Sequence, residues 1–226
     1  MLFVLDLCYN LFTEGDCMRL RKVKGASEEI DNSLYVIKDY CNYKGKFNTI
    51  FSNNNPIYIE IGMGKGKFII ENARRYPDIN FIGIEKFDSV LVRAIQSVGD
   101  EVIPNLKFIR MDAKEISNVF NKEISKIYLN FSDPWPKERH AKRRLSSKNF
   151  LVFYDNIFKN KKIIEMKTDN RLLFEYSLKS FLDYGYNLED ISLDLHNSDY
   201  PNNILTEYEE KFSKKGQVIY YCSVKK

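Results

Sequence analysis

The sequence is poor in the residues that build metal centres and disulfide frameworks. It has two histidines and four cysteines among 226 residues, and no two cysteines show Cys-x-x-Cys spacing. The sequence therefore predicts no metal site. Scattered thiols without a disulfide framework are typical of a reducing compartment, so we expect a cytoplasmic protein.

Long apolar runs are also missing. The apolar stretch at residues 1–12 lacks a basic leader, is interrupted by Asp6 and is too short to span a bilayer. We therefore expect neither a signal peptide nor a membrane-spanning segment. The net charge of +4 is small, so total charge alone does not indicate nucleic acid as a partner.

Composition divides the chain into three parts. A basic run begins at Met18, which predicts that residues 1–17 are a non-essential extension. We expect residues 18–55 to form a basic segment that packs on a single domain at residues 56–226. The sequence indicates no protein partner, and a monomer and a homodimer fit it equally.

Strand and helix patterns alternate along this domain. The expected strands cover residues 57–61, 81–84, 106–110, 125–131, 163–167, 187–193 and 217–224. The expected helices cover residues 66–75, 114–120 and 148–158, with two more that begin at the caps Asp88 and Asp169. Parallel strands need crossover helices, so this order predicts an α/β fold. Its seven-stranded sheet is mostly parallel, has helices on both faces and carries an antiparallel hairpin at one edge.

In such a sheet, ligands bind beyond the carboxyl ends of the strands. A glycine loop, Gly62, Gly64 and Gly66, follows the first strand, and Glu85 ends the second strand. Glycines allow a tight turn and a close approach of a ligand to the backbone. An acid at the end of the second strand is typical of a contact to the two hydroxyls of a ribose, so the pair predicts a nucleoside-containing cofactor.

The residues around the glycines indicate which nucleoside binds. A Walker loop needs a hydroxyl after its lysine, and Phe68 occupies the relevant place. Glu60 directly precedes the glycines and would repel the pyrophosphate of NAD. A carboxylate there suits a ligand with a cationic end, such as S-adenosylmethionine. Asp112, just past the third strand, is placed to bind the adenine amino group.

The fourth strand leads into the segment Ser132-Asp133-Pro134-Trp135-Pro136. Its two prolines exclude both helix and ladder pairing, so Asp133 lies on a stiff loop at a strand end. A fixed carboxylate and an aromatic side chain beside the cationic residues that follow suit a polyanionic ligand that carries a base. For Trp135, filling of the core and stacking on a base are both consistent with the sequence.

A cationic strip follows this loop. Its only acid is Glu138, whereas a solvated face usually mixes charges of both signs. The strip predicts binding of RNA phosphates, and His140 is expected to be a polar or phosphate contact. The candidate RNA-binding residues are Arg139, His140, Lys142, Arg143 and Arg144.

Six motifs together resemble the bacterial tRNA (guanine-N7-)-methyltransferase family. They are Glu60-Ile-Gly-Met-Gly-Lys-Gly, Ile82-Gly-Ile-Glu85, Asp112-Ala, Asn130-Phe-Ser-Asp-Pro-Trp-Pro-Lys, Lys167-Thr-Asp-Asn170 and Thr206-Glu-Tyr-Glu-Glu210. The resemblance covers residues 18–226. It implies a Rossmann-like class I methyltransferase fold and methyl transfer from S-adenosylmethionine to N7 of a variable-loop guanosine (position 46) in tRNA. It also implies cofactor contacts at Glu60, Glu85, Asp112 and Asp133 and substrate contacts at Lys137, Asp169, Thr206, Glu207, Tyr208 and Glu209.

The chemistry of guanine N7 fits these residue types. N7 carries a lone pair and no proton, so its methylation needs in-line placement and no general base. The methylated purine is cationic, and we expect Asp133 to be the catalytic carboxylate that stabilises this charge. We expect Asp169 and Glu209 to accept hydrogen bonds from the guanine N1–H and N2–H₂ groups, although a simple helix cap also fits Asp169. Two other functions are consistent with the fold. The cationic strip argues against a small-molecule methyltransferase, and the four cofactor acids argue against a non-catalytic RNA-binding protein.

Overall fold

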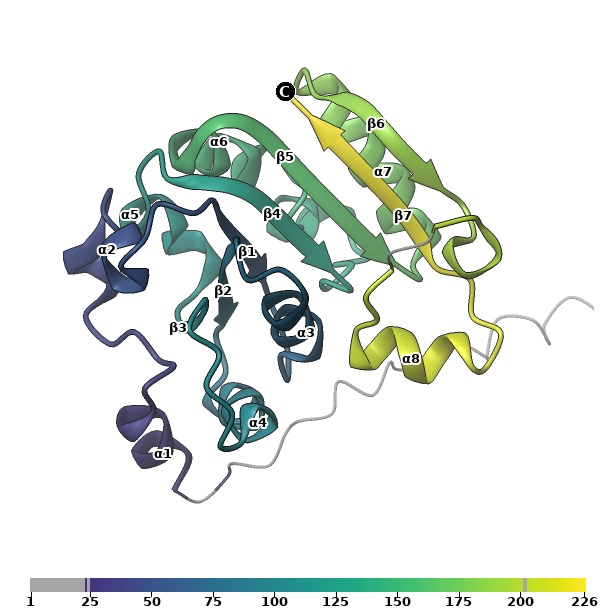
Figure 1. Cartoon of the computed structure of the whole chain (residues 1–226). Helices are drawn as coiled ribbons and strands as arrows, with labels where there is room; N and C mark the ends of the chain where they lie inside the picture. The colour runs from purple at the N-terminus through teal and green to yellow at the C-terminus, as the bar shows by residue number, and fades with distance from the viewer. Residues whose placement is uncertain (1–22, 24, 201–202) are drawn as a thin grey trace, which may run out of the picture.

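The computed structural model describes residues 23, 25–200 and 203–226, and these build one seven-stranded sheet. The strand order is β3-β2-β1-β4-β5-β7-β6, and only β7 runs against its neighbours (Figure 1). The mostly parallel sheet with an antiparallel edge pair is therefore confirmed. The strands are β1 Ile57–Ile61, β2 Asn80–Glu85, β3 Leu106–Arg110, β4 Ile124–Asn130, β5 Phe158–Thr168, β6 Asn187–Ser192 and β7 Tyr220–Lys225.

Helices cover both faces of the sheet, with α3 and α4 in front and α6 and α7 behind in Figure 1. All six residues of β2 are buried, as expected of a central parallel strand that is covered on both sides. Its side chains alternate between the two hydrophobic clusters: Phe81 belongs to the cluster that includes residues of α3 and α4, and Ile82 belongs to the cluster that includes residues of α5, α6 and α7. The α-helices are α1 Ala26–Asn32, α2 Asn48–Phe51, α3 Lys67–Arg75, α4 Asp88–Val98, α5 Ile116–Val119, α6 Lys148–Ile157, α7 Arg171–Asp183 and α8 Glu207–Ser213. Short 3-10 helices are η1 Tyr40–Tyr43, η2 Ala113–Glu115, η3 Glu138–Arg143 and η4 Leu195–Asn197.

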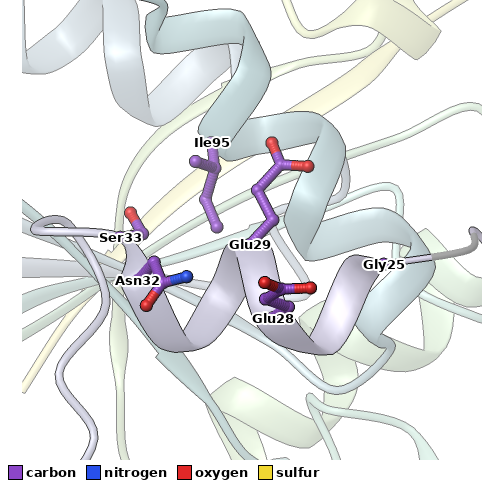
Figure 2. Close-up of a pocket in the computed structure, with 6 residues that line it drawn as sticks. All are labelled: Gly25, Glu28, Glu29, Asn32, Ser33 and Ile95. Carbon is purple, nitrogen blue, oxygen red and sulfur yellow. The ribbon is translucent and has the colours of Figure 1, made fainter.

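The described part of the basic N-terminal segment packs along the β3 edge of the sheet. Helix α1 lies on α4, and Val36 forms a parallel bridge with Phe108 of β3. A pocket between α1 and α4 is lined by Glu28, Glu29 and Ile95 among others (Figure 2). It contains none of the predicted site residues. The expected extension at residues 1–17 lies outside the described residues.

Two predicted helix caps were wrong. Asn170 caps α7, because its side chain accepts a hydrogen bond from the N–H of Leu173 at 2.8 Å. Asp88 lies inside the first turn of α4, where it pairs with Arg110 at 3.1 Å. Asp169 is therefore not used as a cap and is available for another role.

Helix α8 was missed, because a loop was expected between the last two strands. Its signal was present in the sequence: Thr206 and Glu209 form a capping box, in which each side chain accepts the backbone N–H of the other. Strand β7 consequently begins at Tyr220, three residues later than expected. In the described part of the chain, no helix is both long enough and apolar enough to cross a bilayer.

Candidate active site at the carboxyl ends of the strands

A cavity at the carboxyl ends of the strands has a volume of about 670 Å³, within the size range of small-molecule sites. The loops that follow β1, β2, β3 and β4 line it. These loops bring together five of the predicted cofactor residues. They are Gly62, Gly64, Glu85, Asp112 and Asp133.

Backbone N–H groups hold the carboxylate of Glu85 at the end of β2. One oxygen accepts from Lys86 at 2.8 Å and Phe87 at 3.0 Å, and the other accepts from Gly64 at 3.2 Å. Burial raises the pKa of Glu85, the three N–H donors oppose this rise, and the nearby charge of Asp133 adds to it. A carboxylate offers about four acceptor positions, so one remains for a ligand hydroxyl.

Asp112 caps η2 and accepts hydrogen bonds from two donors. Its Oδ2 accepts from Lys86 Nζ at 2.7 Å, and its Oδ1 accepts from the N–H of Lys114 at 3.0 Å. Partial burial raises the pKa of Asp112, but these donors outweigh burial and hold the pKa below its ordinary value. Asp112 therefore stays ionised at the cavity wall. The lysine partner, Lys86, was not predicted.

Glu60 is nearly fully buried at the end of β1, with 2% of its surface exposed. Asn130 donates to its Oε1 at 2.9 Å, whereas its Oε2 is buried without a hydrogen-bond partner among the described residues. Burial raises the pKa of Glu60 to about 8, against the opposing effects of Asn130 and Lys167. A buried acceptor without a donor is unfavourable, so this oxygen is suited to a cationic donor from a ligand.

Glu60 lines a second cavity of about 160 Å³ that shares Gly62, Gly64 and Phe131 with the large one. The two cavities therefore meet at the glycine loop. Glu85 and Asp112 line the large cavity on one side of the loop, and Glu60, with its unpaired oxygen, lines the small cavity on the other. This donor set fits S-adenosylmethionine.

Gly66 differs from the other two glycines because it lines neither cavity. Its φ of 83° favours glycine, and a Cβ there would lie 3.0 Å from the Cβ of Ala94. The requirement for glycine is thus explained by the close packing of α3 against α4. Gly66 therefore helps to position the glycine loop and does not line either cavity.

The loop after β4 has strained backbone at two aromatic residues. Phe131 has a φ of 49° and Trp135 a φ of 42°, values that bulky side chains rarely adopt. Arg144 holds this loop from below: it donates to the carbonyl oxygens of Pro134 at 2.9 Å and Trp135 at 3.1 Å. Asp133 lies exposed at the mouth of the cavity.

Arg144 therefore departs from its predicted role. Only 8% of its surface is exposed, and its guanidinium stacks 4.2 Å from the ring centre of Tyr176. A side chain in this position holds the Asp133 loop and does not face a phosphate. The sequence signal was ambiguous because Arg144 stands in a run of exposed cations.

The rest of the cationic strip is exposed. Lys137, Arg139, Lys142 and Arg143 lie on or next to η3 at the surface. Trp135 packs between two members of the strip, with Arg143 at 4.8 Å and His140 at 5.8 Å from its ring centre. Trp135 also lines the large cavity, so it joins the cofactor cavity to the cationic surface.

The residues on α8 separate into two groups. Tyr208 is exposed, and its hydroxyl donates to Asp169 Oδ2 at 2.9 Å. Glu207 is exposed and lies 3.7 Å from Lys65. These residues line or adjoin the site mouth.

Glu209 and Thr206 form the buried group. Glu209 is fully buried, and its oxygens contact Lys167 at 3.0 Å, Asn203 at 2.7 Å and His196 at 3.1 Å. It also accepts the N–H of Thr206 at 3.3 Å. The prediction that Glu209 accepts the guanine N–H groups therefore does not fit this arrangement, because its acceptor positions are occupied. The pair holds α8 against the end of β5.

Comparisons with known proteins agree with this geometry. The family described as "Putative methyltransferase" matches residues 54–222. A Bacillus velezensis protein named tRNA (guanine-N(7)-)-methyltransferase is 53% identical over 92% of this chain and 96% of its own length. A Bacillus subtilis protein of the same name is 52% identical, over 92% of this chain and 98% of its own.

Solved structures share the fold at much lower sequence identity. An antibiotic-related methyltransferase has a TM-score of 0.61 at 16% identity, and it covers 80% of this chain and 92% of its own. The 16S rRNA methyltransferase KamB has a TM-score of 0.60 at 12% identity, with the same shares covered. The fold is that of the class I methyltransferases. The chain belongs to the tRNA (guanine-N(7)-)-methyltransferase family.

Proposed function

We propose that this protein transfers a methyl group from S-adenosylmethionine to N7 of a guanosine in tRNA, and that this guanosine is in the variable loop. One observation carries the proposal beyond family membership. Glu60, Glu85, Asp112 and Asp133 come from four strand ends and surround two joined cavities beside a cationic surface. Free thiols at Cys41 and Cys222 are consistent with work in the reducing cytoplasm.

The chain holds the donor through charge and position. When bound, S-adenosylmethionine supplies an electrophilic methyl carbon on a sulfonium. Glu85 would accept from a ribose hydroxyl, Asp112 would accept from the adenine amino group, and the free Oε2 of Glu60 would accept from the ammonium group. Asn130 keeps Glu60 in place, because it donates to the other oxygen at 2.9 Å.

Asp133 acts where charge develops. With the donor bound, the N7 lone pair would form a bond to the methyl carbon, and the electrons of the broken carbon–sulfur bond would remain on sulfur. No proton moves, so no base is required. The purine becomes cationic, and the exposed carboxylate of Asp133 at the cavity mouth stabilises that charge. Positioning of the two reactants can supply about 7–11 kcal/mol of the lowered barrier.

Asp169 selects guanine, with Tyr208 as its support. The hydroxyl of Tyr208 occupies Oδ2 of Asp169, which leaves Oδ1 for the guanine N1–H or N2–H₂ donors. Adenine lacks these donors, so it would leave the carboxylate unpaired and bind more weakly.

The cationic surface recruits the tRNA. Lys137, Arg139, Lys142 and Arg143 are exposed beside Trp135, and they can neutralise phosphates as the guanosine enters. His140 packs against the same ring.

A methylation assay tests the proposal. The protein is incubated with unmodified tRNA and a methyl-labelled donor, and borohydride–aniline cleavage then locates 7-methylguanosine. We expect one labelled methyl per tRNA and cleavage in the variable loop. No incorporation at any salt concentration would contradict the function. Incorporation without cleavage would mean that the methyl group is on an atom other than N7. Cleavage outside the variable loop would contradict only the proposed location of the guanosine.

A further inference from the structure

A row of aromatic rings leads away from the site along α8. The ring of Phe131, at the end of β4, lies 4.9 Å from that of Tyr208, and Tyr208 stacks on Phe212 at 4.2 Å. Tyr208 and Phe212 share one helix face because they are four residues apart. Tyr208 is 40% exposed, so the row reaches solvent directly beside the cavities.

Two lysines without acidic partners flank the end of this row. Lys211 lies 5.4 Å and Lys215 lies 5.3 Å from the ring centre of Phe212, and neither forms an ion pair with a described residue. Lys214 differs because Glu210 neutralises it at 3.1 Å. The ring of Phe212 is half-buried, and cations held over a ring that reaches the surface are typical of sites that stack unpaired bases and contact the adjoining phosphates.

The row and the η3 cations are separate surfaces that both adjoin the cavities, since Tyr208 lines the small cavity and Arg143 lines the large one. Helix α8 contacts the α3 side of the sheet through the ion pairs of Lys67 with Glu210 and of Lys65 with Glu207. The η3 segment leads to the α7 side, where Arg144 stacks on Tyr176. An RNA strand whose guanosine enters between them would contact both surfaces.

We propose that Tyr208, Lys211, Phe212 and Lys215, the α8 ridge, form a second RNA-binding surface. The ridge stacks an unpaired base next to the target guanosine, and its lysines bind the phosphates on either side. This inference rests on the proposed function for its RNA, and its test measures binding separately from methylation. RNA is favoured over an acidic peptide as the ligand, because a peptide could pair with the lysines but would have no base to stack on the ring of Phe212.

The first test neutralises the lysines. We expect Lys211→Gln with Lys215→Gln to weaken tRNA binding and to flatten the slope of log affinity against log salt by about one to two units. The matched control is Lys159→Gln with Lys161→Gln, two exposed lysines at the amino end of β5, far from the site. Affinity for S-adenosylhomocysteine reports that each variant keeps its fold. Equal slopes for ridge and control variants would overturn the ridge.

The second test asks whether the ring contacts RNA. We expect Phe212→Leu to weaken binding of tRNA at least about fivefold, because one stacked base is lost. The photoreactive substitution Phe212→p-benzoylphenylalanine should crosslink to nucleotides beside the methylated guanosine. Crosslinks to distant nucleotides, or none, would overturn the ridge even if the wild type methylates N7. A wild type that binds tRNA through the ridge without methylating it would instead overturn the proposed function.

Discussion

The buried carboxyl of Glu60 gives the sharpest prediction, because its environment ties stability, cofactor binding and pH together. Its pKa rises from an ordinary 4.5 to about 8, chiefly through burial. The unfolded chain therefore releases this proton at lower pH than the folded protein does. Stability of the ligand-free protein is thus highest below pH 4.5 as far as Glu60 is concerned, and it falls as the pH rises towards 8. The change Glu60→Gln removes this dependence and nearly preserves the shape.

The size of the effect follows from the pKa difference. Each pH unit between 4.5 and 8 corresponds to about 1.4 kcal/mol, so the window from pH 5.5 to pH 7.5 corresponds to about 3 kcal/mol. Relative to the wild type, Glu60→Gln should gain about this much stability over that window. Cofactor binding should respond in the opposite direction, because a bound ammonium favours the ionised carboxylate. The ratio of wild-type to variant affinity should rise by up to about tenfold per pH unit from pH 6 and level off near pH 8.

Two measurements check these numbers. Urea unfolding of the ligand-free proteins at pH 5.5 and 7.5 gives the difference in stability, and calorimetric titration with S-adenosylhomocysteine gives the affinity ratio. The ratio cancels titration of the ligand itself, since both proteins bind the same compound. Glu175→Gln, at an exposed ion pair on α7, is the control and should show no comparable pH dependence. A stability difference that stays flat between the two pH values would refute the role assigned to Glu60.

The remaining predictions concern the loop after β4 and α8. Asp133→Ala should collapse the single-turnover methylation rate and leave tRNA affinity unchanged; an unchanged rate would remove Asp133 from the chemistry. Arg143→Gln should flatten the slope of log tRNA affinity against log salt by about one unit in a filter-binding series. An unchanged slope would show that Arg143 does not bind a phosphate. Arg144→Gln should instead lower the free energy of unfolding by about 1–3 kcal/mol, because two partly buried carbonyl oxygens lose their donor; a stability equal to the wild type would contradict this. Tyr208→Phe should lower kcat/KM for tRNA about tenfold, because Asp169 loses the hydrogen bond that holds it. A kcat/KM equal to that of the wild type would argue against this role of the contact.

The sheet was predictable because its signals are local. Apolar runs such as Ile57–Ile61, bounded by turn residues, identify buried parallel strands, and the helices between them fix the connections. Placement of the acids followed in turn, because the strand ends of a parallel sheet meet at one edge. Glu85, Asp112 and Asp133 line one cavity for this reason.

The rest depended on tertiary contacts that the sequence does not display. Arg144 looks like its neighbours in the chain, and only the fold turns it under the Asp133 loop. Glu209 was expected to face guanine, but Lys167 and His196 converge on it from other elements. In both cases a charged residue that was expected to contact the substrate instead holds the backbone of the site, and its burial distinguishes the two roles.

The central claim is that strand-end acids hold a methyl donor against N7 of a guanosine in tRNA. The most direct measurement compares methyl incorporation into two otherwise identical tRNAs, one with guanosine and one with 7-deazaguanosine in the variable loop. The account predicts one methyl per tRNA in the first case and none in the second, because 7-deazaguanosine has carbon in place of N7. Equal incorporation into both tRNAs would contradict it.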